Sequence, residues 1–157
     1  MNGLLDLVLP NLKATRNLAK TLAPLLRPGD VVTLEGPIGI GKTTFIRALL
    51  ETLGCIEDVP SPTFNLLHTY ELGSVTFWHF DLFRIERLPD VYELGIEDAL
   101  ETGICLIEWP KVMANLLPTE RLELEFFYQE ECSRRVSLKG NGTWGQRLRK
   151  VGSYLDE

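Results

Sequence analysis

Short apolar runs alternate with amphipathic segments along most of this chain. Runs rich in Leu, Val and Ile predict strands, and apolar positions three or four residues apart predict helices between them. Strands are expected over residues 4–9, 31–34, 64–70, 74–80, 104–107, 122–128 and 135–138, the last two as an antiparallel pair. Helices are expected over residues 12–26, 42–53, 88–100 and 143–155, the third as one or two short helices. Strands that alternate with helices favour an α/β fold.

A glycine-rich segment lies between the expected strand 31–34 and the expected helix 42–53. Residues 36–43 read G-P-I-G-I-G-K-T, which matches the phosphate-binding pattern G-x-x-x-x-G-K-[ST]. The glycines allow consecutive backbone N–H groups to surround an anion, and the N-terminus of the next helix adds its positive dipole. Lys42 adds a full charge near the β- and γ-phosphates, and the Thr43 hydroxyl is placed to bind Mg²⁺. The nucleotide-binding residues predicted here are Gly36, Pro37, Ile38, Gly39, Ile40, Gly41, Lys42, Thr43 and Thr44.

Two acids follow expected strands. Asp81 comes directly after residues 74–80, and Glu108 comes directly after residues 104–107. In open α/β sheets ligands bind beyond the carboxyl ends of the strands, so each acid is expected to bind Mg²⁺ or order a water molecule. A helix cap or a salt bridge is the alternative for each. His79 lies two residues before Asp81, either as a hydrogen-bonded core histidine or as a residue that supports the site.

Two further segments are candidates for the same site. Pro60 and Pro62 restrict the backbone around Ser61 and Thr63, and such a loop can hold a hydroxyl near the γ-phosphate. A plain stiff turn is the alternative. Trp109, next to Glu108, is either an aromatic lid on the core or part of the site surface.

Composition narrows the class of protein. The 157 residues, 45% of them apolar and 24% charged, suit one soluble globular domain spanning residues 1–157. No stretch approaches the roughly 20 apolar residues of a membrane span, and the first residues lack the features of a secretory signal. Cys55, Cys105 and Cys132 form no CxxC pair, so a reducing cytoplasm is expected rather than a zinc site or disulfides.

The charge is unevenly distributed. The formal net charge of −6 disfavours tight, non-specific binding to nucleic acid. Residues 133–155 nevertheless contain no acid and six basic side chains: Arg134, Arg135, Lys139, Arg147, Arg149 and Lys150. They form either a solvated face or a docking patch for phosphates or an acidic partner.

Five segments together resemble the TsaE (formerly YjeE) family of bacterial P-loop ATPases. They are GPIGIGKTTF (36–45), SPTF (61–64), HFDLFR (79–84), ELGIED (93–98) and ICLIEWP (104–110). The resemblance implies a P-loop NTPase-like three-layer fold, with a small mixed, largely parallel sheet flanked by helices. It also implies an Mg²⁺-dependent ATPase that is weak alone and acts with the proteins TsaB and TsaD. Those partners attach a threonylcarbamoyl group to adenosine 37 of tRNAs that read codons starting with A, so contact with tRNA would be indirect or through the complex.

The resemblance also implies roles for single residues. Lys42, Asp81 and Glu108 match the catalytic positions, and Thr43, Asp81 and Glu108 match the metal site. Ser61 and Thr63 match a switch-like loop, and Trp109 matches a functionally important tryptophan. Adenine lies near the first helix in this family, which makes Asn11 and Thr15 candidate contacts.

Other nucleotide-binding classes remain open. A small-molecule P-loop kinase needs an acceptor pocket and an arginine-bearing lid, but Arg84 and Arg87 are scattered. A GTPase needs an N/T-K-x-D motif, which is missing from the sequence. A binding module that does not hydrolyse its nucleotide would be distinguished by a turnover assay.

Overall fold

The computed structural model describes residues 3–130 and 133–155, so Cys132 and both ends of the expected 1–157 domain lie outside the described residues. Within the described part, one sheet has the strand order β1-β7-β6-β2-β5-β4-β3. The strands are β1 (Gly3–Leu9), β2 (Val31–Glu35), β3 (Leu67–Leu72), β4 (Val75–Asp81), β5 (Ile104–Glu108), β6 (Leu122–Tyr128) and β7 (Arg134–Gly140). The helices are α1 (Leu12–Leu22), α2 (Lys42–Thr52), α3 (Leu88–Tyr92), α4 (Ile96–Thr102) and α5 (Thr143–Leu155), with 3₁₀ segments η1 (Ala23–Leu25) and η2 (Pro110–Leu116).

The sheet is mixed, as the family resemblance implies, with as many antiparallel as parallel strand pairs among the described residues. β2 pairs in parallel with β5 and β6, and β4 pairs in parallel with β5. The pairs β1–β7, β6–β7 and β3–β4 are antiparallel, which confirms the antiparallel pair predicted for the last two strands. The parallel pairs thus occupy the centre of the sheet, and their carboxyl ends meet at one edge.

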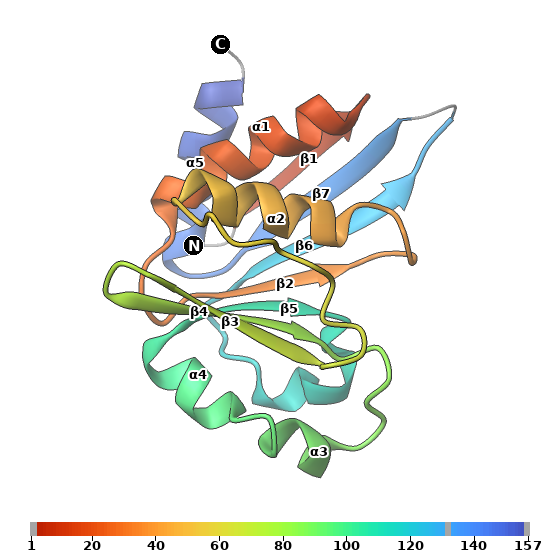
Figure 1. Cartoon of the computed structure of the whole chain (residues 1–157). Helices are drawn as coiled ribbons and strands as arrows, with labels where there is room; N and C mark the ends of the chain where they lie inside the picture. The colour runs from red at the N-terminus through yellow and green to blue at the C-terminus, as the bar shows by residue number, and fades with distance from the viewer. Residues whose placement is uncertain (1–2, 131–132, 156–157) are drawn as a thin grey trace.

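Helices cover both faces of the central strands (Figure 1). On β2, Val32 and Leu34 belong to a core shared with α1, α2 and α5, whereas Val31 belongs to a second core shared with α3, α4 and η2. Cys105 and Ile107 of β5 also face the second core. Successive side chains point to opposite faces of a strand, so strands buried on both faces appear as the continuous apolar runs seen in the sequence.

Most element ends lie within one or two residues of the sequence-based expectation, and three parts of the chain differ more. The first helix leaves α geometry after Leu22 and continues as η1, because Pro24 cannot donate a backbone hydrogen bond. β3 begins at Leu67 rather than at residue 64, since the preceding residues turn: the Leu66 N–H donates to the Pro62 carbonyl at 2.6 Å. The segment η2 was not predicted, and it begins at Pro110, where a fixed φ favours a helical start.

The basic C-terminal segment is not one uniform surface. Arg147 is 4% exposed, and its guanidinium donates to both carboxylate oxygens of Asp30 at 2.6 and 2.9 Å. Arg147 is therefore an internal ion-pair residue, and its inclusion in a docking patch was wrong. Arg135, by contrast, is exposed and stacks over the ring of Phe127, and Lys150 is exposed on α5.

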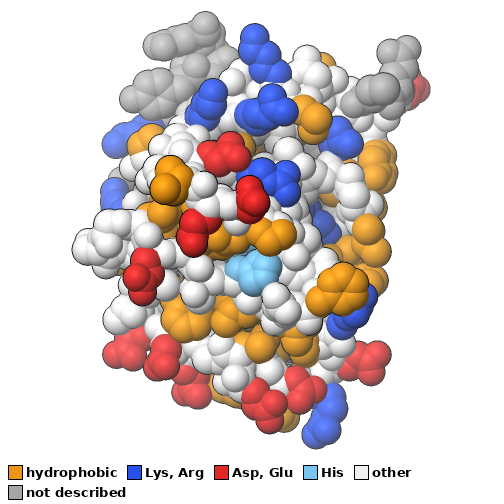
Figure 2. All heavy atoms as spheres, in the orientation of Figure 1, with side chains coloured by type: hydrophobic (Ala, Val, Ile, Leu, Met, Phe, Trp, Pro, Cys, Tyr) orange, Lys and Arg blue, Asp and Glu red, His pale blue; other side chains and the backbone are white. Residues whose placement is uncertain are grey.

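Charges separate along the molecule. Figure 2 shows acidic side chains gathered along the lower edge, over α3 and α4, and most basic side chains towards the opposite end. Asp90, Glu97 and Asp98 lie in the first turns of those two helices, where negative charge complements the helix dipole. None of the described helices has both the length and the apolar character needed to cross a membrane.

Candidate functional site

The glycine-rich loop 36–41 connects β2 to α2. Gly36 and Gly41 have φ values of 145° and 120°, which side-chain-bearing residues rarely adopt. A Cβ atom at Gly36 would also lie 2.9 Å from the carbonyl oxygen of Phe126, so no larger residue fits there. Ile40 is fully buried and fixes the loop to the core. The loop backbone and the N-terminus of α2, which has no side-chain cap, therefore face the same space as an anion cradle.

Lys42, the first residue of α2, is 4% exposed. Its ammonium donates to the Gly36 carbonyl at 2.5 Å and lies 3.6 Å from the centroid of the Trp109 ring. Burial lowers the pKa of Lys42 below 10.5, while the carboxylates of Glu108 and Asp81 act in the opposite direction. Within the described part of the chain, no carboxylate lies within salt-bridge distance of this ammonium, so its charge is available to an anion.

The two predicted acids lie side by side. Asp81 is the last residue of β4, Glu108 is the last residue of β5, and the two are direct partners in the parallel register. They are 6% and 3% exposed. Leu34 of β2 is in register with Glu108 on its other side, so the strand that leads into the phosphate loop ends beside both acids. Sheet register therefore brings together acids that are 27 residues apart in the sequence.

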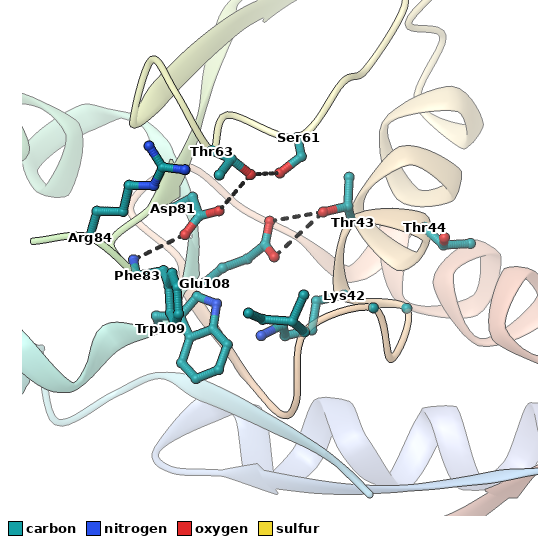
Figure 3. Close-up of a pocket in the computed structure, with 13 residues that line it drawn as sticks. Lys42, Thr43, Thr44, Ser61, Thr63, Asp81, Phe83, Arg84, Glu108 and Trp109 are labelled. Carbon is teal, nitrogen blue, oxygen red and sulfur yellow. Dashed lines mark hydrogen bonds between the residues drawn. The ribbon is translucent and has the colours of Figure 1, made fainter. Parts of the chain in front are cut away.

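Glu108 lies between the phosphate loop and β4 (Figure 3). The Thr43 hydroxyl lies 3.3 and 3.5 Å from the two carboxylate oxygens of Glu108. The Nε2 atom of His79 lies 2.6 Å from the Oε2 atom of the same carboxylate. Glu108 thus contacts a hydroxyl and an imidazole, and it has no arginine or lysine partner among the salt bridges of the described residues.

Asp81 connects to the proline-flanked loop. Its Oδ1 accepts a hydrogen bond from the Phe83 backbone N–H at 3.0 Å, and its Oδ2 accepts one from the Thr63 hydroxyl at 3.4 Å. The Ser61 and Thr63 hydroxyls are themselves 2.6 Å apart, with Ser61 exposed and Thr63 half-buried. A movement of the Asp81 carboxylate would therefore alter its hydrogen bond with Thr63, and through Thr63 the contact with Ser61 on the surface loop.

Aromatic side chains form one wall of the site. Trp109 adopts a left-handed backbone conformation with φ 57° and ψ 59°, an uncommon geometry for a bulky residue. In this conformation the Trp109 ring contacts the ammonium of Lys42 and the ring of Phe83. The centroids of the two aromatic rings are 4.8 Å apart. The sequence left open whether Trp109 covers the core or belongs to the site surface, and in the structure its side chain lines the site. Arg84 stacks over the ring of exposed Phe64 at 4.8 Å.

These groups line one cavity of about 310 Å³. The predicted site residues among its lining are Ile38, Gly39, Gly41, Lys42, Thr43, Thr44, Ser61, Thr63, Asp81, Glu108 and Trp109. Gly36, Pro37 and Ile40 belong to the loop but do not line the cavity. Phe83 and Arg84 line it and were not predicted, although both lie in the HFDLFR segment that carries Asp81.

The two candidate adenine contacts lie elsewhere. Asn11 caps α1, since its Oδ1 accepts a hydrogen bond from the Ala14 N–H at 2.9 Å, and it lines a second, more open hollow. Thr15 is only 2% exposed and lines neither hollow. Tyr128 lines the second hollow, and its hydroxyl lies 3.5 Å from the carbonyl oxygen of Ile38 in the phosphate loop. The second hollow is therefore adjacent to the cradle.

The donor groups of the cavity fit a magnesium nucleotide. No cluster of three or more His, Cys, Asp or Glu side chains in the described residues could hold a metal by itself. The oxygen donors of Thr43, Asp81 and Glu108 are instead a partial set of hard ligands. Mg²⁺ prefers such a set when substrate phosphates and water complete its octahedral shell.

Comparisons with known proteins agree with this arrangement. Residues 9–136 match the family model described as threonylcarbamoyl adenosine biosynthesis protein TsaE. A relative from Rickettsia felis named tRNA threonylcarbamoyladenosine biosynthesis protein TsaE is 39% identical over 138 residues, which cover 87% of this chain and 81% of the relative. A protein of the same name from Bacillus subtilis is 39% identical over 133 residues, which cover 84% of this chain and 83% of the relative.

A solved structure is similar over its whole length. The crystal structure of Bacillus subtilis YdiB superposes with a TM-score of 0.79 at 30% sequence identity. The match covers 100% of this chain and 99% of the YdiB chain. The mixed α/β architecture is therefore shared along the full length of both chains.

Proposed function

This chain belongs to the TsaE family, and we propose that it serves tRNA threonylcarbamoyladenosine biosynthesis by binding and hydrolysing Mg-ATP. One observation carries the proposal: a phosphate cradle, a buried ammonium and two strand-end carboxylates open into the same cavity. A purely structural turn would require none of these charged groups at one place. The whole chain is proposed to act as a single cytoplasmic ATPase domain.

Each side chain has a distinct part in this proposal. The loop backbone binds phosphate oxygens, and Lys42 moves from the Gly36 carbonyl to the same anion. Thr43 and Glu108 would hold Mg²⁺, which when bound would neutralise charge that develops on the phosphates. Asp81, which lines the same cavity, would orient either the attacking water molecule or a water molecule held by the metal. These roles are electrostatic and positional, as phosphoryl transfer requires.

Coupling to partners belongs to the same proposal. Ser61 and Thr63 lie on the surface and connect to Asp81 through one hydrogen bond, so we assign them to sensing the γ-phosphate. The partner proteins are TsaB and TsaD, and tRNA contact is indirect or through their complex. The chain alone is a monomer with weak turnover, and the partners stimulate it.

Asn11 remains a candidate contact for the nucleoside part of the nucleotide, because the hollow that it lines adjoins the phosphate loop.

The test is phosphate release from ATP by the purified chain, with and without purified TsaB and TsaD. We expect Mg²⁺-dependent turnover that the partners stimulate. Glu108→Gln keeps the shape of the side chain and removes its charge, so it should lower turnover by about 10²–10³-fold. Asp6→Asn is the matched control, because Asp6 is an exposed carboxylate on β1.

Three outcomes would count against the proposal. Wild-type turnover in Glu108→Gln, with the partners present, contradicts the assignment of that acid. Nucleotide binding without any turnover supports the non-hydrolysing binding module. Transfer of the γ-phosphate to a small metabolite in the absence of partners supports the kinase, whose strongest structural support is the presence of Arg84 at the cavity.

A further inference from the structure

A histidine lies beneath the proposed metal side of the cavity. His79 is on β4, two residues before Asp81, and its side chain is fully buried. Its register partners are Leu106 on β5 and His68 on β3. Side chains two residues apart on a strand share a face, so His79 and Asp81 both point to the face that carries α2 and the phosphate loop.

The imidazole makes one short contact with the site. Its Nε2 lies 2.6 Å from the Oε2 of Glu108, a distance at which a proton must lie between the two atoms. Its Nδ1 is buried and has no hydrogen-bond partner in the described residues. A buried lone pair without a partner costs less than a buried N–H without one. The neutral tautomer with the proton on Nε2 therefore satisfies both observations, and His79 donates to Glu108.

The hydrogen bond from His79 restricts the orientation of the Glu108 carboxylate. The Oε2 atom that accepts from His79 lies 3.3 Å from the Thr43 hydroxyl, and the other carboxylate oxygen lies 3.5 Å from it. Rotation of the carboxylate would break the short bond and leave a buried imidazole N–H unpaired, which is unfavourable. The Glu108 carboxylate is thus held facing Thr43.

We propose that His79 is a positioning residue that orients Glu108 towards the Mg²⁺ of a bound nucleotide, an inference that rests on the proposed function. Buried imidazole–carboxylate pairs of this kind fix ligand orientation in metal sites, and their loss commonly costs about 10–100-fold in metal affinity or activity. The competing view is that His79 only fills the core between β3 and β5.

Three substitutions separate the two views. His79→Gln places an amide N–H where Nε2 stands, whereas His79→Asn places it near the position of Nδ1, out of reach of Glu108. His79→Phe keeps a planar ring and removes the donor. A positioning role predicts that His79→Gln retains function and that the other two lose it. A role in filling the core predicts that His79→Phe, which keeps an apolar aromatic ring at the same place, is tolerated at least as well as His79→Gln.

The readout is equilibrium binding of a fluorescent ATP analogue, titrated with Mg²⁺ or with EDTA present. For His79→Phe and His79→Asn, we expect the Mg²⁺ concentration at half-saturation to rise about 10–100-fold. Binding in EDTA should stay at the wild-type level, because the phosphate cradle is intact. His68→Gln is the matched control: it removes the neighbouring histidine, which contacts Asn65 rather than the cavity, and should leave both titrations unchanged.

Failure of the inference and failure of the proposed function give different results. A wild-type chain that binds no nucleotide overturns both. A wild-type chain with Mg²⁺-dependent binding, matched by His79→Phe, overturns only the inference. Equal losses with Mg²⁺ and with EDTA also overturn it, because they indicate a general packing defect.

A measurement on the wild-type chain keeps the test valid if a variant does not fold. The sequence contains only two histidines, so His68→Gln assigns the imidazole ¹⁵N signals without ambiguity. We expect a protonated Nε2 and an unprotonated Nδ1 at His79 in a long-range ¹H–¹⁵N spectrum. A protonated Nδ1 with a bare Nε2 would rule out the bond to an ionised Glu108.

Discussion

Buried charges lie at both ends of the central strands, and their hydrogen bonding differs. At the amino end of β2, Asp30 accepts two hydrogen bonds from Arg147 and a third from the Arg27 backbone N–H. Arg147 also donates to the Leu25 carbonyl and the Thr143 hydroxyl. At the carboxyl ends, Lys42, Asp81 and Glu108 are just as buried, but each retains bonding capacity that faces a cavity.

The difference separates a charge that stabilises the fold from one that is kept for a ligand. A buried ion pair supports the fold when most of its remaining donors and acceptors are also paired. Around Asp30 both carboxylate oxygens and both terminal nitrogens of Arg147 are paired, and only the Arg147 Nε lacks a partner among the described residues. A site that will bind an anion and a cation must leave some of these groups unpaired, and this lowers stability. The amino end should therefore control folding, and the carboxyl ends should control binding.

The largest expected effect is a loss of folding stability when the ion pair at the amino end of β2 is broken. Asp30→Ala leaves the Arg147 guanidinium buried without its carboxylate, so we expect the free energy of unfolding to fall by about 3–5 kcal/mol. Urea denaturation measures it. The affinity of the folded fraction for nucleotide should not change, because the cavity is at the opposite end of the strand. A loss below about 1 kcal/mol would remove the distinction between the two ends.

The reverse pattern is expected at the other end. If the chain hydrolyses ATP as proposed, Lys42→Met should lower turnover by about 10²–10³-fold, because it removes the charge that would face the phosphates. It should not lower stability, since burial of the ammonium lowers the pKa of Lys42 and is therefore unfavourable to its charged form. Lys20→Met on α1 is the control, as Lys20 is exposed. Marked unfolding of Lys42→Met would contradict the comparison.

The pH dependence of the same variant has a definite sign. Between the lowered pKa of Lys42 and its ordinary value of 10.5, the unfolded chain binds more protons than the folded chain. The contribution of Lys42 to stability therefore becomes more favourable as pH rises through this interval. Any stability advantage of Lys42→Met over wild type should accordingly shrink from neutral to alkaline pH in parallel denaturation curves.

A smaller effect is expected from close packing at the amino end of β5. A Cβ at Gly103 would lie 2.6 Å from the Trp78 ring and 3.0 Å from the Thr76 carbonyl oxygen, so Gly103→Ala should cost about 1–3 kcal/mol. In Gly152→Ala the new Cβ has a single neighbour among the described residues, at 3.9 Å, and the helical site should gain up to about 1 kcal/mol. Thermal unfolding compares the two. Equal stability changes in Gly103→Ala and Gly152→Ala would mean that the Trp78 side chain moves and makes room for the new Cβ at position 103.

The smallest effect is expected on the surface of α5. Lys150 is exposed three residues after buried Arg147, so Lys150→Gln should change stability by less than about 0.5 kcal/mol. Arg147→Gln, on the same helix, should cost several times more because it leaves Asp30 unpaired. Co-sedimentation of Lys150→Gln with TsaB and TsaD then tests the docking patch without unfolding the chain. Similar stability losses in both variants would contradict the burial difference.

Much of the candidate site could be predicted because most of its residues lie in short contiguous segments with recognisable patterns. The phosphate loop needs glycines at fixed spacing and a lysine at a helix start, and all of these lie in residues 36–43. The positions of Asp81 and Glu108 at strand ends follow from apolar runs that stop at each acid. Phe83 and Arg84 were missed because no local pattern indicates which side of a loop faces a cavity.

The sequence by itself determined the alternation of strands and helices, the anion cradle and the two strand-end acids, because each depends on neighbours along the chain. Only the tertiary structure decided that Asp81 and Glu108 are in register, that His79 donates to Glu108 and that Arg147 is internal. These contacts join residues 27, 29 and 117 positions apart. Such pairings depend on strand register and helix docking, which are fixed by the packing of the whole core rather than by any local segment.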